Sequence, residues 1–170
     1  MNAFYVFAAA LIVPISAMAD QFTYRYQLAG YAYDRYDEKG AIDYDGFAAA
    51  FDQFPWTAQL RQSTAVGEGC SATIFVTDSE RHLDYWVSIA GDEKKPFFLL
   101  GVTYDKEVRG FLGFGKPRQT RWVEIYVAPS RDSVLSTFRL FFTGQTDELM
   151  KTLRSYDKFD EMEAWKPPKA

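Results

Sequence analysis

The middle of the chain carries four apolar segments that polar turns and loops separate. Residues 72–76 and 85–89 are rich in β-branched and aromatic side chains and flank the turn-like sequence 78–81. Residues 97–104 are a nearly continuous apolar run, and residues 122–127 alternate between two faces. Because side chains on a strand alternate between two faces and short turns join antiparallel neighbours, these four segments predict a meander with one face in a core.

A further strand is expected near the N-terminal end of this region. Residues 22–28 alternate strictly between apolar and polar side chains, which is typical of a half-buried strand. Ala29 and Gly30 interrupt the pattern, and residues 31–33 resume it before the polar run 34–45. A hairpin and a single bulged strand explain this segment equally well.

Three segments switch to helical spacing. Residues 44–54 place phenylalanines on one side, with Asp43 available as N-cap and Pro55 preventing continuation. Residues 134–142 form an apolar stripe. A third segment opens at Thr146, which is expected to cap it.

The boundaries of the second helix are also marked. Ser130 or Asp132 can open it and Gly144 can close it. The sequence therefore predicts an α+β fold: a single antiparallel sheet, a meander of about four to six strands, with one N-terminal and two C-terminal helices packed on one face.

The first nineteen residues are typical of a secretory signal peptide. Met1 to Ala19 carry no charge, and a small-x-small sequence ends the apolar run just before Asp20. The apolar run is too short to span a bilayer comfortably. We expect cleavage near Ala19, a periplasmic or secreted mature protein, and no stable membrane insertion afterwards. Since the usual Lys or Arg of such a leader is missing, a retained membrane-anchoring start is the alternative.

About 150 residues remain after the leader, which is the size of one domain. We expect a signal peptide at residues 1–19, a single globular domain at 20–156, and a charged, loosely ordered tail at 157–170. The net charge of −4 and the pI near 5.0 argue against nucleic acid as a partner and favour a basic partner.

Candidates for chemistry are few. Cys70 and His82 are the only residues of their types, and a dyad between them is formally possible, but neither lies in a recognisable motif. We expect a small buried Cys70 and a turn residue His82, and no disulfide. The glycine-rich stretch 110–117 lacks the spacing of a phosphate-binding loop, so it is interpreted as a hairpin loop that exposes Phe111 and Phe114.

Carboxylates offer two further alternatives. Calcium could gather oxygen ligands from the acids between Asp34 and Asp45, but the EF-hand spacing is absent and a solvated acidic loop is favoured. Glu124 lies between Trp122 and Tyr126, without a nameable partner for glycoside hydrolysis. We expect Glu124 to pair with a cation of a neighbouring strand at the solvent face. No catalytic residue, metal ligand or cofactor is therefore assigned.

Tyrosine and acid are concentrated between residues 24 and 45. Tyrosine suits interfaces because it gives a large rigid surface at low entropy cost, and acids attract a basic partner. The alternative is that Tyr24 and Tyr26 belong to the core and that the acidic side chains only interact with solvent. The predicted partner-binding residues are Tyr31, Tyr33, Asp34, Tyr36, Asp37, Glu38, Phe111 and Phe114.

In size, leader and acidity the chain resembles, in a general way, immunity proteins that neutralise bacterial toxins. We expect an exported protein-binding protein, an inhibitor of the immunity type, that blocks a toxin or envelope enzyme by surface complementarity and is not itself an enzyme. One alternative is an envelope carbohydrate-binding, peptidoglycan-binding or hydrolytic domain with Trp86, Trp122 and Tyr126 on the exposed face of the sheet. Another is an envelope structural protein whose own interface contains the loop 110–117.

Overall fold

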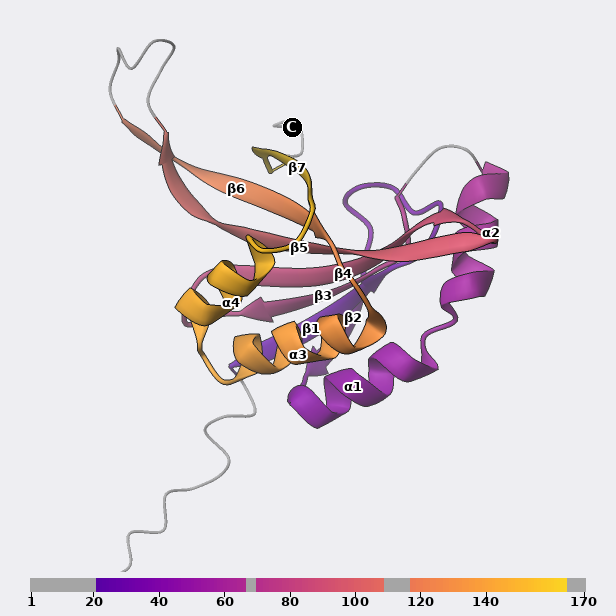
Figure 1. Cartoon of the computed structure of the whole chain (residues 1–170), viewed down its shortest axis with the longest axis horizontal. Coiled ribbons are helices and arrows are strands. Elements are labelled where there is room, and N and C mark those ends of the chain that lie inside the picture. The colour runs from indigo at the N-terminus through magenta and orange to yellow at the C-terminus, as the bar shows by residue number, and fades with distance from the viewer. Residues whose placement is uncertain (1–20, 67–69, 109–116, 165–170) are drawn as a thin grey trace, which may run out of the picture.

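The described part of the chain has a single open antiparallel sheet of seven strands and four helices (Figure 1). A computed structural model describes residues 21–66, 70–108 and 117–164. The spatial order of the strands is β2-β1-β3-β4-β5-β6-β7, so the chain order is broken only where β3 pairs with β1. The elements are β1 (Phe22–Gln27), β2 (Asp37–Ala41), α1 (Tyr44–Gln53), α2 (Trp56–Val66), β3 (Thr73–Asp78), β4 (Leu83–Asp92), β5 (Lys95–Val108), β6 (Arg118–Val127), α3 (Arg131–Phe142), α4 (Thr146–Leu153) and β7 (Lys158–Glu163).

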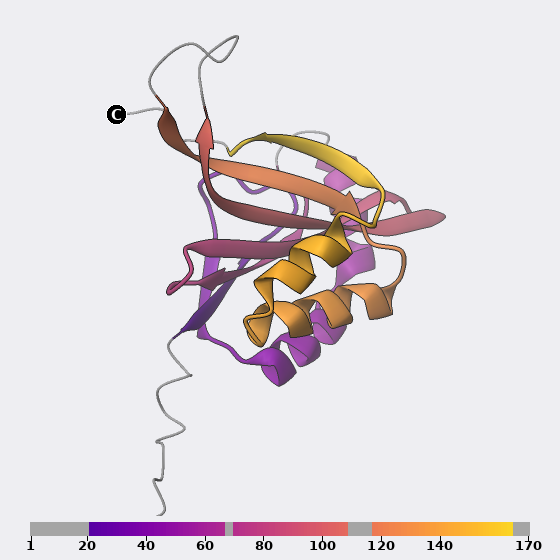
Figure 2. The same ribbon diagram turned by 60° about the vertical axis from the view of Figure 1, so that its left-hand side comes forward.

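The helices form a layer along the sheet. Helices α1, α3 and α4 lie side by side on one face, and the sheet curves around them (Figure 2). Helix α2 stands at the end of the sheet, where Trp56 contacts Phe98 of β5 with ring centroids 5.2 Å apart. We call the face under α1, α3 and α4 the helix face and the opposite one the open face. No helix in the described ranges is long and apolar enough to cross a membrane.

The core lies between the sheet and the phenylalanines of the helices. Ile74, Val87, Leu100 and Tyr126 are in register across four neighbouring strands, and each is at most 2% exposed. Phe47, Phe51, Phe138 and Phe141 cover this row from α1 and α3. Such side chains contribute about 1.5–3 kcal/mol each when fully buried, which makes this layer the main source of stability.

The α+β class and the single antiparallel sheet are as predicted, but the number of strands and the helix arrangement differ. The prediction of four to six strands is wrong because β2 and β7 add an edge strand on each side. An edge strand faces solvent and needs no apolar alternation, so the polar residues of β2 gave no strand signal. Neither interpretation of residues 29–33 is correct in detail, because these residues lie in the loop between β1 and β2, and β1 pairs antiparallel with β2.

The C-terminal segment also differs from expectation. Residues 158–163 are expected to lie in a loosely ordered tail, whereas in the structure they pair with residues 122–126 of β6. Residues 165–170 lie outside the described residues. Helix α2 was not predicted, because Leu60 is its only buried residue and its apolar stripe is correspondingly weak.

The predicted helix ends are mostly confirmed. Asp43 accepts a hydrogen bond from the Gly46 amide at 2.8 Å, and Ser130 accepts one from Ser133 at 3.1 Å. Gly144 follows α3 with a φ of 70°, a backbone conformation that glycine tolerates. The cap expected at Thr146 is wrong, because Thr146 is the first residue of α4 and Gln145 precedes it without a side-chain cap.

On the open face, the indole of Trp86 lies very close to Gly101. Phe75, Trp86, Gly101 and Ile125 are in register across β3, β4, β5 and β6. A Cβ at Gly101 would lie 1.9 Å from two ring atoms of Trp86, far inside van der Waals contact. Glycine is therefore required at position 101 as long as the indole of Trp86 keeps its place.

This contact generates a stability prediction. Gly101→Ala is expected to lower the free energy of unfolding by about 1–3 kcal/mol, because the new methyl group displaces the indole. In a Trp86→Ala background the same change is expected to cost little, so the two substitutions are non-additive. Denaturant unfolding of the two single variants and the double variant measures this coupling. Equal costs of Gly101→Ala in both backgrounds would contradict the packing described.

Candidate functional site

The predicted acidic and aromatic residues come together at one edge of the sheet. They occupy the loop 28–36 and the edge strand β2. Tyr33 is 59% exposed, and Asp34 and Glu38 are exposed as well. We call this set the Tyr/Asp edge: Tyr31, Tyr33, Asp34, Tyr36, Asp37 and Glu38.

Several contacts hold the aromatic rings of the Tyr/Asp edge. The Tyr31 hydroxyl donates to Asp37 at 3.3 Å, and the Arg35 guanidinium lies 3.9 Å from the centre of the Tyr31 ring. The Tyr36 hydroxyl donates to the carbonyl oxygen of Tyr33 at 3.0 Å. These rings therefore occupy defined positions at the surface, outside the hydrophobic core cluster.

Tyr36 also anchors the loop onto the open face. Its ring meets Phe75 of β3 edge to face at 5.6 Å, and the Arg25 guanidinium lies 4.7 Å from its centre. Burial raises the pKa of Tyr36, so its hydroxyl stays protonated at neutral pH. In contrast, Tyr24 and Tyr26 pack against the core. This agrees with the alternative in which these two tyrosines are core residues and do not contact a partner.

The remaining predicted contact residues, Phe111 and Phe114, lie outside the described residues. Two acids of this region have partners within the protein: Asp43 caps α1 and Asp37 accepts from Tyr31. Across the described parts of the chain, no three His, Cys, Asp or Glu side chains come together in a way that could hold a metal ion.

Cys70 and His82 do not form a dyad. Cys70 precedes β3 and His82 follows it, so the length of this six-residue strand, roughly 17 Å at 3.3 Å per residue, separates them. Cys70 is buried, and burial raises the pKa of its thiol, which disfavours the nucleophilic thiolate. His82 lies in a turn, as expected, with a φ of 52° that is uncommon for a residue other than glycine.

Glu124 is buried on the helix face, whereas the sequence placed it at the solvent face. It is only 5% exposed, and it accepts hydrogen bonds from the hydroxyls of Tyr104, at 2.5 Å, and Tyr126. Its ion pair is with Arg154 of the chain just after α4, at 3.7 Å, whereas the sequence predicted a cation of a neighbouring strand. Lys158 of the neighbouring strand β7 adds a favourable electrostatic interaction. The tyrosine hydroxyls satisfy the carboxylate, which makes its burial tolerable.

These contacts set the ionisation of the cluster. Burial alone would raise the pKa of Glu124, but the two tyrosine hydrogen bonds and the nearby Arg154 and Lys158 outweigh it and lower that pKa. Burial and the bond to Glu124 raise the pKa of Tyr104 to about 12. Glu124 is therefore a carboxylate and both tyrosines are neutral donors at pH 7.

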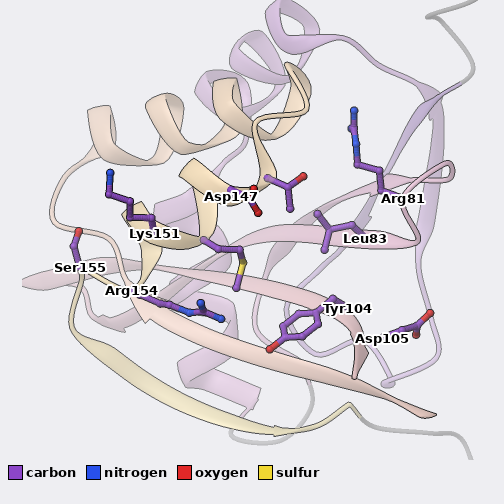
Figure 3. A pocket seen from close by; sticks show the side chains of 10 residues that line it. Arg81, Leu83, Tyr104, Asp105, Asp147, Lys151, Arg154 and Ser155 are labelled. Carbon is purple, nitrogen blue, oxygen red and sulfur yellow. The ribbon is translucent and has the colours of Figure 1, made fainter. Parts of the chain in front are cut away.

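A cavity of 780 Å³ opens beside this cluster, between α4 and strands β4 and β5 (Figure 3). Figure 3 shows Arg154 and Tyr104 reaching toward one another from opposite sides of it. Its basic residues all have acidic neighbours: Arg81 pairs with Asp78, Lys151 with Glu148 and Arg154 with Glu124. Each positive charge at the cavity is therefore balanced by a neighbouring negative charge.

The three aromatic residues expected to form one exposed platform are divided between the faces. Tyr126 is 2% exposed beneath the helices, and Trp122 lies on the same face with Lys106 4.1 Å from its ring. Trp86 lies on the open face in register with Gly101. A platform of all three is therefore wrong, and only Trp86 stays available at the open face.

The chain matches no protein-family model, no curated protein and no solved structure in comparisons with known proteins. Its functional assignment therefore depends on the geometry of its own residues.

The Glu124 cluster makes stability depend on pH. Because its pKa in the folded state lies below the ordinary value of 4.5, the carboxylate stabilises the fold above that value. This contribution is lost as the pH falls through 4.5 toward the folded-state pKa. Glu124→Gln is expected to lower the free energy of unfolding at pH 7 by about 1–3 kcal/mol and to flatten its dependence on acid pH. Denaturant unfolding across the acid range measures both effects.

Glu148→Gln is the matched control, since its carboxylate is exposed and pairs with Lys151 at 3.3 Å. We expect a change below about 0.5 kcal/mol for this variant. Similar losses in both variants, or an unaltered pH profile for Glu124→Gln, would show that the buried cluster does not contribute as described.

Proposed function

We propose that this protein is an exported protein-binding protein and that its Tyr/Asp edge contacts a basic partner protein. The observation that carries the proposal is the exposed Tyr33, 59% accessible, beside the fixed rings of Tyr31 and Tyr36. Aromatic side chains that already have defined positions lose little rotamer freedom on binding. Such a surface suits recognition of another protein.

Charge supports the choice of partner. Asp34 and Glu38 are exposed beside Asp37, and the whole chain carries a net charge of −4. Acidic groups at the rim of an interface attract a basic partner and mainly accelerate association. The partner we propose is a protein with a basic surface.

The type of binder follows from the leader together with the scaffold. The signal peptide proposed for residues 1–19 implies that the partner is met outside the cytoplasm. Helices that pack against one face of the sheet give a rigid support, and an inhibitor needs only such a support and a complementary surface. We therefore propose an immunity-type inhibitor of a bacterial toxin or an envelope enzyme.

Site-specific crosslinking tests the contact surface. A photoreactive amino acid at position 33 is expected to yield a covalent adduct with one partner protein in living cells. The same amino acid at position 157, in the exposed turn before β7 at the opposite edge of the sheet, serves as the control and is expected to yield none. Adducts from both positions, or only from position 157, would refute the Tyr/Asp edge as the contact surface.

The crosslinked partner then allows a charge test. Asp34→Lys combined with Glu38→Lys is expected to slow association at low salt by about tenfold or more, and the difference should shrink at high salt. Asp37 is left unchanged because it accepts the Tyr31 hydrogen bond. Surface plasmon resonance measures the rates, with Asp157→Lys as the control. An unchanged association rate would exclude electrostatic attraction by this edge.

Export is tested separately. Mass spectrometry of the protein from the periplasmic fraction is expected to give a mass that begins near Asp20. Leu11→Arg, which places a charge in the apolar run, is expected to keep the untrimmed chain in the cytoplasm. An untrimmed natural form in the cytosol would contradict the proposed compartment.

A further inference from the structure

The open face carries an aromatic ring that lies flat on the sheet. A Cβ built on Gly101 would meet Cε2 and Cζ2 of Trp86 at 1.9 Å and Cη2 at 2.5 Å. Because a Cβ points out of the sheet and these three ring atoms lie at such similar distances from it, the indole presents its face, not its edge, to Gly101. The other face of the indole therefore points away from the sheet, and Trp86 is partly exposed.

Neighbouring side chains extend this surface along the same row. The Phe75 ring lies 6.1 Å from Trp86, and the Arg25 guanidinium lies between Phe75 and Tyr36, at 5.2 and 4.7 Å from their centres. The row Arg25, Phe75, Trp86 and Gly101 follows the strand pairing of β1, β3, β4 and β5. Phe75 therefore lies beside the indole on the β3 side, and Gly101 leaves room for it on the β5 side.

A polar pocket lies next to this surface. Asp84 and Trp86 are two residues apart on β4 and share the open face, about 7 Å from each other along the strand. The pocket has a volume of 340 Å³. Its lining residues are Thr77, Asp78, Ser79, His82, Asp84, Asp105 and Arg121.

Hydrogen bonds hold the polar groups of the pocket in place. Asp84 accepts from the Thr77 hydroxyl at 2.7 Å and from Arg121 at 2.6 Å. Arg121 also donates to the carbonyl oxygen of His82 and lies 3.4 Å from Asp105. Carboxylates, a guanidinium and hydroxyls therefore surround a small, ordered space.

We propose that Trp86 and this pocket form a binding site for a saccharide. A pyranose ring has an apolar C–H face, which fits a flat indole, and a rim of hydroxyls, which can pair with both donors and acceptors. Asp84, Asp105 and Arg121 supply such donors and acceptors. The volume is at the small end of the range for small-molecule sites, about 300–1,000 Å³, as expected for one sugar ring. A phosphate-rich ligand would meet the carboxylates of Asp78, Asp84 and Asp105 and is disfavoured.

Titration with soluble oligosaccharides tests the site. The probes are the tetramer of β-1,4-linked N-acetylglucosamine and the corresponding tetramer of glucose, followed by NMR of the tryptophan indole N–H resonances. Trp86→Phe assigns the Trp86 resonance. Saturable binding of at least one tetramer, with a shift of the Trp86 resonance, is the expected result. Binding of both tetramers indicates recognition of the ring itself, and binding of the first alone indicates recognition of its acetamido group.

Variants give the proposal a second readout. Trp86→Ala is expected to weaken binding about tenfold or more. Asp105→Asn removes one charged acceptor from a side chain that is 56% exposed, so it leaves the core untouched and is also expected to weaken binding. Trp122→Phe, on the helix face, is the control and is expected to bind like the natural protein.

The proposal is overturned if neither tetramer shifts the Trp86 resonance. It is also overturned if Asp105→Asn and a folded Trp86→Ala bind as tightly as the natural protein. The crosslinking at position 33 reports on a different surface, so failure of the saccharide site leaves the proposed protein-binding function to be judged separately.

Discussion

The stacking of Phe47 on Phe138 joins the two halves of the fold. The rings lie 3.7 Å apart and are inclined by only 16°, and Phe138 also contacts Tyr85 at 4.3 Å. Phe47 comes from α1 and Phe138 from α3, so the contact fixes helices from distant parts of the chain on the central strand β4. Everything positioned by the sheet, including the Tyr/Asp edge and Trp86, depends on this aromatic layer.

Polar groups at this layer fix the relative positions of α4, β5 and β6. Tyr126 is part of the core, and its hydroxyl reaches Glu124, which in turn lies near Arg154 just after α4. The carboxylate therefore ties the C-terminal end of α4 to β5 and β6 at one position. An apolar side chain there could fill the space but would leave two tyrosine hydroxyls without an acceptor.

The central strands could be predicted because their apolar, β-branched and aromatic runs, bounded by turn residues, are typical of strands that pack on a core. The helical spacing of α1 and α3 was equally clear, since Phe47, Phe51 and Phe138 recur on one side. Strand β2 and helix α2 gave weak signals because they bury little apolar surface. In β6, both faces carry apolar residues. The alternation of side chains therefore showed which residues share a face, but it did not show which of the two faces the helices cover.

Of the candidate surfaces, too, some could be predicted from the sequence and others could not. The Tyr/Asp edge was predictable from local composition, because its residues are neighbours in sequence. The flat position of Trp86 was not, since it depends on the register of β4 with β5, which places Gly101 beneath the indole. Glu124 was singled out from its neighbours in sequence, but its burial depends on hydroxyls from Tyr104 and Tyr126 that only the folded sheet brings to it.

The position of β7 has a consequence for the order of assembly. This strand follows all others in the chain and pairs with β6, whose backbone groups on that side have no other strand to bond in the described sheet. Until residues 158–163 are in place, β6 presents an unprotected edge to which another extended segment can add. A molecule in which β7 has not yet docked therefore has an additional free strand edge, at β6, that favours self-association.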